Sequence, residues 1–197
     1  MRKFLLLIAF ALSVFMASAQ SNEVYISVNP TTFHADGADG FSPLGLSAGY
    51  NRFIDLGCND ALKLVIGGKL NYAWKSVKHA DWSFMRVTVP VNIGYRFKAG
   101  ELGIMPYAGL DLTLYPLAQI KAEGETASLF DEDEVTELLK ANRFQAGWQI
   151  GADFDFKNVV FGFAYQSDLT KFQDNTVYPV KVKTFFSEFE IKLGYRF

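Results

Sequence analysis

The sequence predicts an all-β protein: a single closed, antiparallel, eight-stranded transmembrane β-barrel with meander topology, preceded by a cleaved signal peptide. Three observations support this fold class. A secretory signal opens the chain, long segments alternate between apolar and polar residues, and short connections alternate with longer ones. Because successive side chains of a strand point to opposite faces, such a segment has one apolar face for lipid and one polar face for a lumen.

The N-terminal segment has the parts of a secretory signal. Two basic residues precede an apolar run over 4–16, and small residues at 17–19 offer a cleavage site. The run is shorter than the roughly twenty residues that a transmembrane helix needs. We therefore predict a signal peptide over 1–19 and an outer-membrane β-barrel domain over 20–197.

Composition limits the possible classes of function. Half of the residues are hydrophobic, but no segment after the signal is long and apolar enough for a transmembrane helix. The net charge of -2 gives no reason to expect nucleic acid as a partner. The single cysteine, Cys58, lies in a predicted turn with no second thiol and no histidine nearby in the sequence, so we expect neither a disulfide nor a catalytic thiol. The 16% of aromatic residues and the 16 glycines fit rings at membrane interfaces and close packing in a narrow barrel.

Eight segments are predicted to be strands. Six alternate clearly, and two weaker ones near the N-terminus complete an even number, the smallest that is common in bacterial barrels. In the last strand, Phe189, Ile191 and Leu193 share one parity, and Glu190 and Lys192 share the other. In chain order the predicted strands are 22–33, 44–54, 62–74, 85–97, 102–114, 144–156, 159–166 and 185–197.

In the six clear strands, every charged residue falls on the polar parity. A lysine or arginine facing lipid at mid-bilayer would cost about 2 to 4 kcal/mol, so this sorting favours a membrane barrel. The alternative is a secreted antiparallel sandwich, whose strands are typically shorter, about five or six residues. The residues predicted to form a salt-bridged polar network in the lumen are Lys63, Lys69, Arg86, Arg96, Asp111, Asp153, Asp155, Glu188, Glu190, Lys192 and Arg196. The last four, from the final strand, are expected to meet Arg86, Arg96, Lys63 and Asp153 or Asp155.

The connections predict the orientation of the barrel. Such barrels have short periplasmic turns and longer extracellular loops. The short connections are 55–61, 98–101 and 157–158, and the longer ones are 34–43, 75–81, 116–143 and 170–182. This alternation predicts that both termini are periplasmic.

Aromatic residues gather at both ends of the predicted strands, which indicates two girdles at the membrane interfaces. The extracellular girdle is predicted to contain Trp74, Trp82, Phe84, Tyr115, Tyr165 and Phe185. The periplasmic girdle is predicted to contain Phe53, Tyr95, Phe97, Phe154, Phe156, Tyr195 and Phe197.

Pro90 and Pro106 lie within predicted strands, where each removes a backbone donor and is expected to force a bulge or a water-filled irregularity. The segments VPVNIGYRF at 89–97 and MPYAGL at 105–110 resemble the central hairpin of the small bacterial outer-membrane protein β-barrel domain family, and the terminal GYRF is similar to its closing strand. The resemblance implies insertion by the barrel assembly machinery, which recognises a final strand carrying Tyr195 and Phe197. It implies no shared catalytic residues.

A lumen of eight strands is just wide enough for side chains to fill, so a large pore is not expected. We predict a monomer with a structural or interaction role in the envelope or in secretion, surrounded by outer-membrane lipids and lipopolysaccharide, with no catalytic residue, cofactor or metal site. One alternative is a narrow channel for small solutes. Another is a lipid A-modifying hydrolase at the outer leaflet that uses His79, Asp81 and Ser83, which share a parity near one loop.

The longest predicted loop, 116–143, is the expected place for a specific function, since loops on a rigid scaffold carry many binding residues. Its acidic run precedes apolar residues spaced as in a short amphipathic helix. The loop is either a solvated cap or a docking site for an envelope protein or for divalent cations that bridge lipopolysaccharide. The candidate interaction residues are Asp131, Glu132, Asp133 and Glu134.

Overall fold

A computed structural model of the chain describes residues 21–35, 38–56, 61–77, 80–122, 124–130, 141–177 and 180–197. The long strands are β1 (Ser21–Ala35), β3 (Leu44–Asp55), β4 (Leu62–Val77), β5 (Ala80–Tyr95), β7 (Leu102–Ala122), β9 (Phe144–Phe156), β10 (Val159–Asp168) and β12 (Val180–Arg196). The short strands are β2 (Ala38–Phe41), β6 (Phe97–Ala99), β8 (Glu125–Ser128) and β11 (Gln173–Val177). Within these residues, no helix has the length and hydrophobicity needed to cross a membrane.

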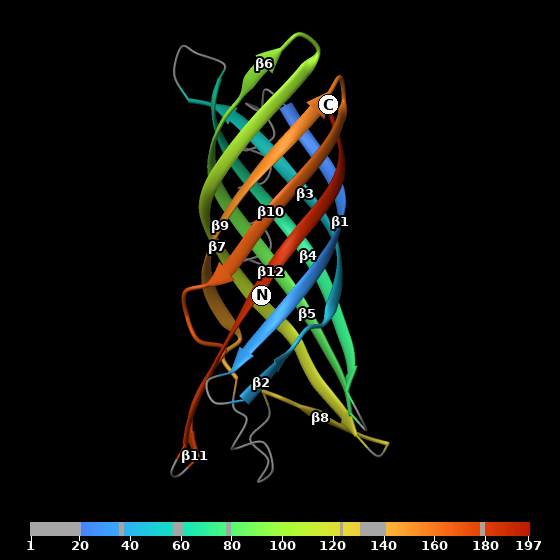
Figure 1. The fold of residues 1–197 in the computed structure, drawn as a ribbon, viewed down its shortest axis with the longest axis vertical. Coiled ribbons are helices and arrows are strands. Elements are labelled where there is room, and N and C mark those ends of the chain that lie inside the picture. Colours follow the sequence, from blue (N-terminus) through green and yellow to red (C-terminus); the bar gives the residue numbers. More distant parts are fainter. Residues whose placement is uncertain are drawn as a thin grey trace, which may run out of the picture.

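The eight long strands form a closed antiparallel barrel (Figure 1). Each pairs with the next long strand along the chain, and β1 also pairs with β12 from Glu23↔Arg196 to Ala35↔Thr184, which closes the sheet. The predicted closed, antiparallel, eight-stranded barrel is confirmed, and the two weaker N-terminal strands pair with each other. Closure leaves the long strands without a free edge around the barrel, as a membrane-spanning sheet requires.

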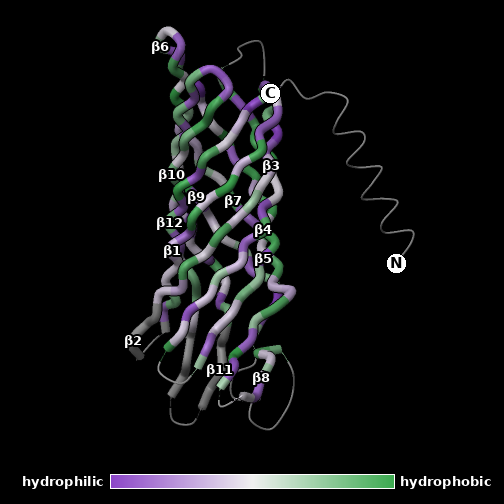
Figure 2. Tube along the Cα trace, turned by 90° about the vertical axis from the view of Figure 1, so that its right-hand side faces the viewer, coloured by the Kyte–Doolittle hydropathy of each residue, from purple (hydrophilic) through white to green (hydrophobic). Residues whose placement is uncertain are grey.

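Burial is inverted relative to a water-soluble sheet. Outward residues such as Ile26 and Leu112 are 65% and 67% exposed, whereas inward Glu23 and Asp153 are 0% and 1% exposed. Figure 2 shows hydrophilic and hydrophobic residues alternating along the strands. The apolar parity therefore forms the outside of the barrel and the charged parity its lumen.

The two ends of the barrel differ. We call the end that holds Ser21, Phe197 and the short turn at 157–158 the terminus end, and the opposite one the hairpin end. At the hairpin end the strands continue beyond the predicted boundaries, and β2, β8 and β11 extend the sheet there (Figure 1). The assignment of 75–81 and 116–143 as loops was therefore wrong in part, because β4 reaches Val77 and β7 reaches Ala122.

A β-bulge explains how β7 passes a proline. Met85 pairs with Leu117 and Val87 with Leu114, so the single residue Arg86 of β5 faces both Tyr115 and Pro116 of β7. Pro116 has no N–H to donate, and a bulge leaves one residue unpaired. The strand can therefore continue where the sequence indicated its end.

The two proline sites in the family-like hairpin interrupt the ladder without shifting its register. Opposite Pro90, β4 and β5 pair at Ile66↔Val91 and at Lys69↔Thr88 but not in between. Beside Pro106, the strand breaks at Arg96 between β5 and β6, while pairing with β7 keeps the same register on both sides. Of the two outcomes expected at these prolines, the bulge is absent and the ladder is interrupted instead, because losing one donor removes a hydrogen bond but inserts no residue.

Candidate functional site

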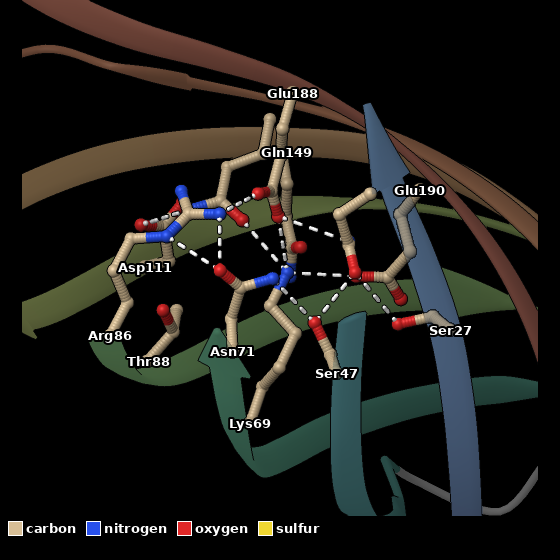
Figure 3. Close-up of polar contacts among 12 residues, drawn as sticks. Ser27, Ser47, Lys69, Asn71, Arg86, Thr88, Asp111, Gln149, Glu188 and Glu190 are labelled. Atoms are coloured by element: carbon tan, nitrogen blue, oxygen red, sulfur yellow. Dashed lines mark hydrogen bonds and ion pairs between the residues drawn. The ribbon is translucent and has the colours of Figure 1, made fainter. Parts of the chain in front are cut away.

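The lumen contains a network of buried ion pairs, which we call the lumenal network. Its hairpin-side part, which is the half nearer the hairpin end, joins β4, β5 and β12 (Figure 3). Lys69 Nζ lies 2.6 Å from Glu188 Oε1 and 2.7 Å from Glu190 Oε2, and Arg86 also pairs with Glu188. Alternation places these side chains inward on three strands, where the narrow barrel brings opposite charges into contact.

Amide and hydroxyl groups complete the hairpin-side part of the network (Figure 3). Arg86 Nε donates to Asn71 Oδ1 at 3.0 Å, and Asn71 Nδ2 donates to Ser47 Oγ at 2.8 Å. Ser47 Oγ donates in turn to Asn29 Oδ1 at 2.6 Å, and Asn29 Nδ2 donates to Glu190 at 3.2 Å. Buried polar groups are costly unless they are paired, and here a chain of hydrogen bonds across four strands and β12 pairs them.

The terminus-side part of the network, which is the half nearer the terminus end, is centred on Lys192 and Arg196 of β12. Lys192 Nζ lies 2.8 Å from Glu23 and 2.9 Å from Asp153. Arg196 contacts Glu23 at 2.8 Å and Asp155 at 3.0 Å, each through a different guanidinium nitrogen. Glu23 of β1 was missing from the predicted network, although it lies on the parity opposite to outward Val24 and Ile26.

The predicted residues near the terminus end have mixed outcomes. Arg96 pairs with Asp155 of β9, so the expectation that Arg96 meets the last strand was wrong. Lys63 instead pairs with Asp55 of the neighbouring strand β3, so the expectation that it meets the last strand was wrong. The cause is register, because Asp55 and Lys63 are directly opposite each other at the end of the β3–β4 ladder.

Asp111 differs from the other predicted lumen residues because it has no ion pair among the contacts of the described residues. It is buried on β7 and accepts hydrogen bonds from Gln166 Nε2 at 3.0 Å and from Thr113 Oγ1 at 3.4 Å. The other ten predicted residues all take part in ion pairs.

Little free space remains in the middle of the lumen. The cavity between the two parts of the network has a volume of about 20 Å³ and is lined by Tyr25, Tyr107, Lys69 and Lys192 among others. That is room for about one water molecule. The lumen is therefore filled by side chains at this level.

At the hairpin end, the lumen is closed by a cluster of rings, which we call the mouth cluster. Its aromatic members are Phe33, Phe84, Tyr115, Phe172 and Phe186, all at most 8% exposed. The Phe172 centroid lies 4.9 Å from that of Tyr115 and 5.0 Å from that of Phe186. Leu129 and Ala141, from segments that follow β8 and precede β9, are buried in the same cluster.

The mouth cluster corrects the predicted girdles. Phe84 and Tyr115 lie inside the barrel, Trp82 packs against the cluster, and at the other end Phe53 is 1% exposed under the Arg196 guanidinium. All four are on the inward parity of their strands or packed with inward residues, so position near a strand end was a misleading criterion. The predicted girdle residues that are exposed on the outside are Trp74, Tyr165, Tyr95, Phe97, Phe154, Phe156, Tyr195 and Phe197.

The remaining candidate residues lie outside the lumen or outside the described residues. Asp81 is exposed at the start of β5 and accepts a hydrogen bond from Ser76 Oγ at 2.6 Å, and Ser83 is half-buried two residues further on. His79 and the acidic residues of 131–134 lie outside the described residues, as does Cys58. Among the described residues, no group of three or more His, Cys, Asp or Glu side chains is arranged to hold a metal ion.

These features define a class of protein: a closed transmembrane β-barrel with an apolar outside and a lumen filled by charged and aromatic side chains. The chain matches the family described as outer membrane protein beta-barrel domain over residues 4–197. The protein belongs to this family, and membership places it among the outer-membrane proteins of Gram-negative type. No curated protein matches the sequence.

Several solved structures share the fold. Ail, the attachment invasion locus protein of Yersinia pestis, is 15% identical with a TM-score of 0.55, over 90% of this chain and 98% of that chain. Neisserial surface protein A is 12% identical with a TM-score of 0.59, over 89% and 97%. The outer membrane enzyme PagL is 13% identical with a TM-score of 0.54, over 88% and 98%. At these identities the likeness shows the fold alone.

Proposed function

We propose that the protein is a monomeric barrel with a structural or interaction role in the cell envelope, and that it is neither a channel nor an enzyme. The observation that carries this proposal is the filled lumen. The lumenal network occupies the middle of the barrel and the mouth cluster closes the hairpin end, with only about 20 Å³ of cavity between the two parts of the network. Function is then left to the outer surface and to the segments beyond the membrane.

Conductance tests the sealed lumen directly. The mature chain, refolded in detergent and shown to be closed by a heat-dependent shift in gel mobility, is added to planar bilayers. We expect no stepwise conductance. Steady single-channel currents from a preparation that shows the mobility shift would favour the narrow channel for small solutes.

We further propose that residues 1–19 are removed as a signal peptide and that both termini face the periplasm. The long connections between β7 and β9 and between β10 and β12 lie at the hairpin end, as extracellular loops do, and the terminus end carries the two-residue turn at 157–158. The test uses a membrane-impermeant maleimide on intact cells. We expect the native Cys58, in the connection between β3 and β4, to react only after permeabilisation, whereas Thr126→Cys in a Cys58→Ala background reacts at once. The reverse pattern would invert the orientation.

The proposed partners follow from this placement. Outer-membrane lipids and lipopolysaccharide surround the apolar face, and the barrel assembly machinery reads the last strand through Tyr195 and Phe197, both exposed on the outside. An envelope protein or bridging divalent cations contact the segment with Asp131 to Glu134. Deleting 131–140 keeps β8 and Leu129, which belong to the fold, and should abolish partner or cation binding while the mobility shift persists.

A lipid hydrolase is the second candidate, because Asp81 and Ser83 line a pocket on the outside of the barrel at the hairpin end and a similar fold, PagL, is an enzyme. The Ser83→Ala variant distinguishes a lipid hydrolase from a barrel with a structural or interaction role. We expect it to leave the lipid A profile of expressing cells unchanged. A profile that changes with the native chain and reverts with Ser83→Ala would establish the hydrolase.

A further inference from the structure

A second feature of the hairpin end lies on the outer surface rather than in the lumen. Strands β4, β5, β7 and β8 form a hollow of about 580 Å³, which we call the outward pocket. Ligand sites for small molecules typically measure about 300 to 1,000 Å³. The outward pocket therefore has the size of a binding site.

The strand pairing sorts the outward side chains of the pocket into two rows. Trp74 is directly opposite Ser83, which is opposite Gln119, and these three form the first row. One alternation step nearer the hairpin tips, the second row consists of Ser76, Asp81, Lys121 and Thr126. Lys75 and Trp82 lie between the rows on the inward parity, so they do not add to the outward face.

The side of the pocket toward the middle of the barrel is aromatic. Tyr72 and Trp74 are stacked, with centroids 5.9 Å apart and ring planes inclined by 25°, and they are 48% and 40% exposed. Aromatic rings on a membrane barrel sit at the headgroup level. The polar residues that follow Trp74 therefore lie among the headgroups, beyond the apolar belt.

The polar side of the pocket carries no net charge. Asp81 and Lys121 are directly opposite each other on β5 and β7, and they are the only charged members of the two rows. Ser76 Oγ donates to the Asp81 carboxylate at 2.6 Å. The remaining polar members are hydroxyl and amide groups, those of Ser83, Gln119 and Thr126. The face thus offers donors and acceptors to an uncharged, hydroxyl-rich ligand, with no excess of charge for an anion or a cation.

We propose that the outward pocket binds the uncharged sugar of an outer-leaflet glycolipid. The C–H face of the sugar lies on Trp74, because the negative face of an aromatic ring attracts weakly positive C–H groups. The sugar hydroxyls donate to the Asp81 carboxylate and exchange hydrogen bonds with the Gln119 amide, which both donates and accepts. A glycolipid fits better than a soluble glycan, since the pocket begins at the aromatic level where acyl chains end. This inference rests on the proposed orientation, which puts the hairpin end at the outer leaflet.

The test measures glycolipid binding to the full mature chain by native mass spectrometry. The detergent is a polyoxyethylene, because a sugar-based detergent would compete for the site. The probe is dephosphorylated lipid A, an acylated disaccharide without charge. Trp74→Ala should bind this probe about tenfold more weakly, because the ring under the sugar is lost. Asp81→Ala should bind it several-fold more weakly, and native affinity in both variants would overturn the site.

A matched control is available among the outward tryptophans. Trp148 of β9 contacts Tyr165, with ring centroids 5.7 Å apart, and is 37% exposed compared with 40% for Trp74, but it does not line the outward pocket. Trp148→Ala should therefore keep native affinity for the probe. Equal losses in Trp74→Ala and Trp148→Ala would mean that exposed rings bind any lipid, which would overturn the site.

Further ligands separate the sugar from other parts of the lipid. Lipid A with two phosphates should bind the native chain no more tightly than the dephosphorylated probe, and a strong preference for the phosphorylated form would overturn the assignment of an uncharged sugar. Phosphatidylethanolamine, which has no sugar, should bind the native chain and Trp74→Ala equally. A free disaccharide of N-acetylglucosamine should bind far more weakly than the probe, and equal affinity would overturn the lipid as the source of the sugar.

Failure of this site is distinguishable from failure of the proposed orientation. Binding in detergent does not depend on which way the barrel is inserted, whereas the maleimide test on intact cells reports the orientation separately. Every variant is first checked for the heat-dependent mobility shift, so loss of binding is scored only in closed barrels.

Discussion

The lumenal network and the mouth cluster both fill the inside of the same barrel, but by opposite chemistry. The network consists of charged side chains that come from the strands themselves and pair with one another, as Lys69 does with Glu188 and Glu190. The mouth cluster consists of packed rings and also uses Leu129 and Ala141 from outside the long strands. The difference shows that a side-chain-filled lumen is a requirement of space, which either ion pairs or apolar packing can satisfy.

The two regions should therefore fail in different ways. Removing one member of a buried ion pair leaves a partner charge uncompensated, which is costly beyond the lost contact. Removing a ring leaves a cavity whose cost depends on how far the neighbours relax. Unfolding by denaturant of the refolded barrel in detergent measures both effects on one scale.

The largest effect is expected at Glu188, which pairs with Lys69 and with Arg86 at once. Glu188→Gln keeps the shape but removes the charge, so Arg86 loses its carboxylate partner in a buried site. We expect a loss of about 3 to 5 kcal/mol in the free energy of unfolding. The control is Glu101→Gln in the exposed turn after β6, which should change stability by less than about 0.5 kcal/mol. A loss below about 1 kcal/mol at Glu188 would mean that water or relaxation compensates the two cations.

The mouth cluster should be next in magnitude. Phe172 contacts five other rings, those of Phe33, Phe84, Tyr115, Phe130 and Phe186. Phe172→Ala is expected to lower the free energy of unfolding by about 3 kcal/mol. The same variant should remain non-conducting in planar bilayers, because the lumenal network still fills the middle of the barrel. Conductance in this variant would mean that the mouth cluster alone blocks the passage of ions through the lumen.

Alternation in the sequence was sufficient to predict most of this interior. Each of the eleven predicted lumen residues faces inward or takes part in the network, since a strand that faces lipid on one side must sort its charges. Partners were harder to predict, because they depend on register: Lys63 pairs with adjacent Asp55 rather than with β12. Glu23 was missed because the alternation of β1 is weaker in sequence, although pairing with β12 sets it directly opposite Arg196.

The mouth cluster was not predicted, for a different reason. Phe84 and Tyr115 were assigned to a girdle from their place near a strand end, but their parity already pointed inward. The continuation of β7 beyond Pro116 depends on a bulge, and no local sequence pattern predicted that bulge. The ring of Phe172 reaches the cluster from a segment between β10 and β11, so only the three-dimensional arrangement brings it there.

A smaller effect is expected at the rim of the network. Arg96 pairs with Asp155, but its side chain is 22% exposed, and Asp155 keeps a second partner in Arg196 at 3.0 Å. Arg96→Gln should therefore cost only about 1 kcal/mol, in the range of partly solvated pairs. Added salt should reduce the difference between the variant and the native chain. A loss as large as that of Glu188→Gln would show that the rim is as dry as the middle of the lumen.

The smallest expected effect is the coupling between the two regions. Glu23 belongs to the terminus-side part of the network, and its ion-pair partners Lys192 and Arg196 are not members of the mouth cluster. A double-mutant cycle with Glu23→Gln and Phe172→Ala should be additive within about 0.5 kcal/mol, as for separated sites without shared partners. The matched cycle pairs Phe172→Ala with Phe186→Ala, whose rings are in contact and should couple more strongly. Additivity in the first cycle together with coupling in the second would mean that charge pairing and ring packing stabilise the barrel independently, whereas strong coupling in the first would mean that a change at the mouth alters the packing of the whole lumen.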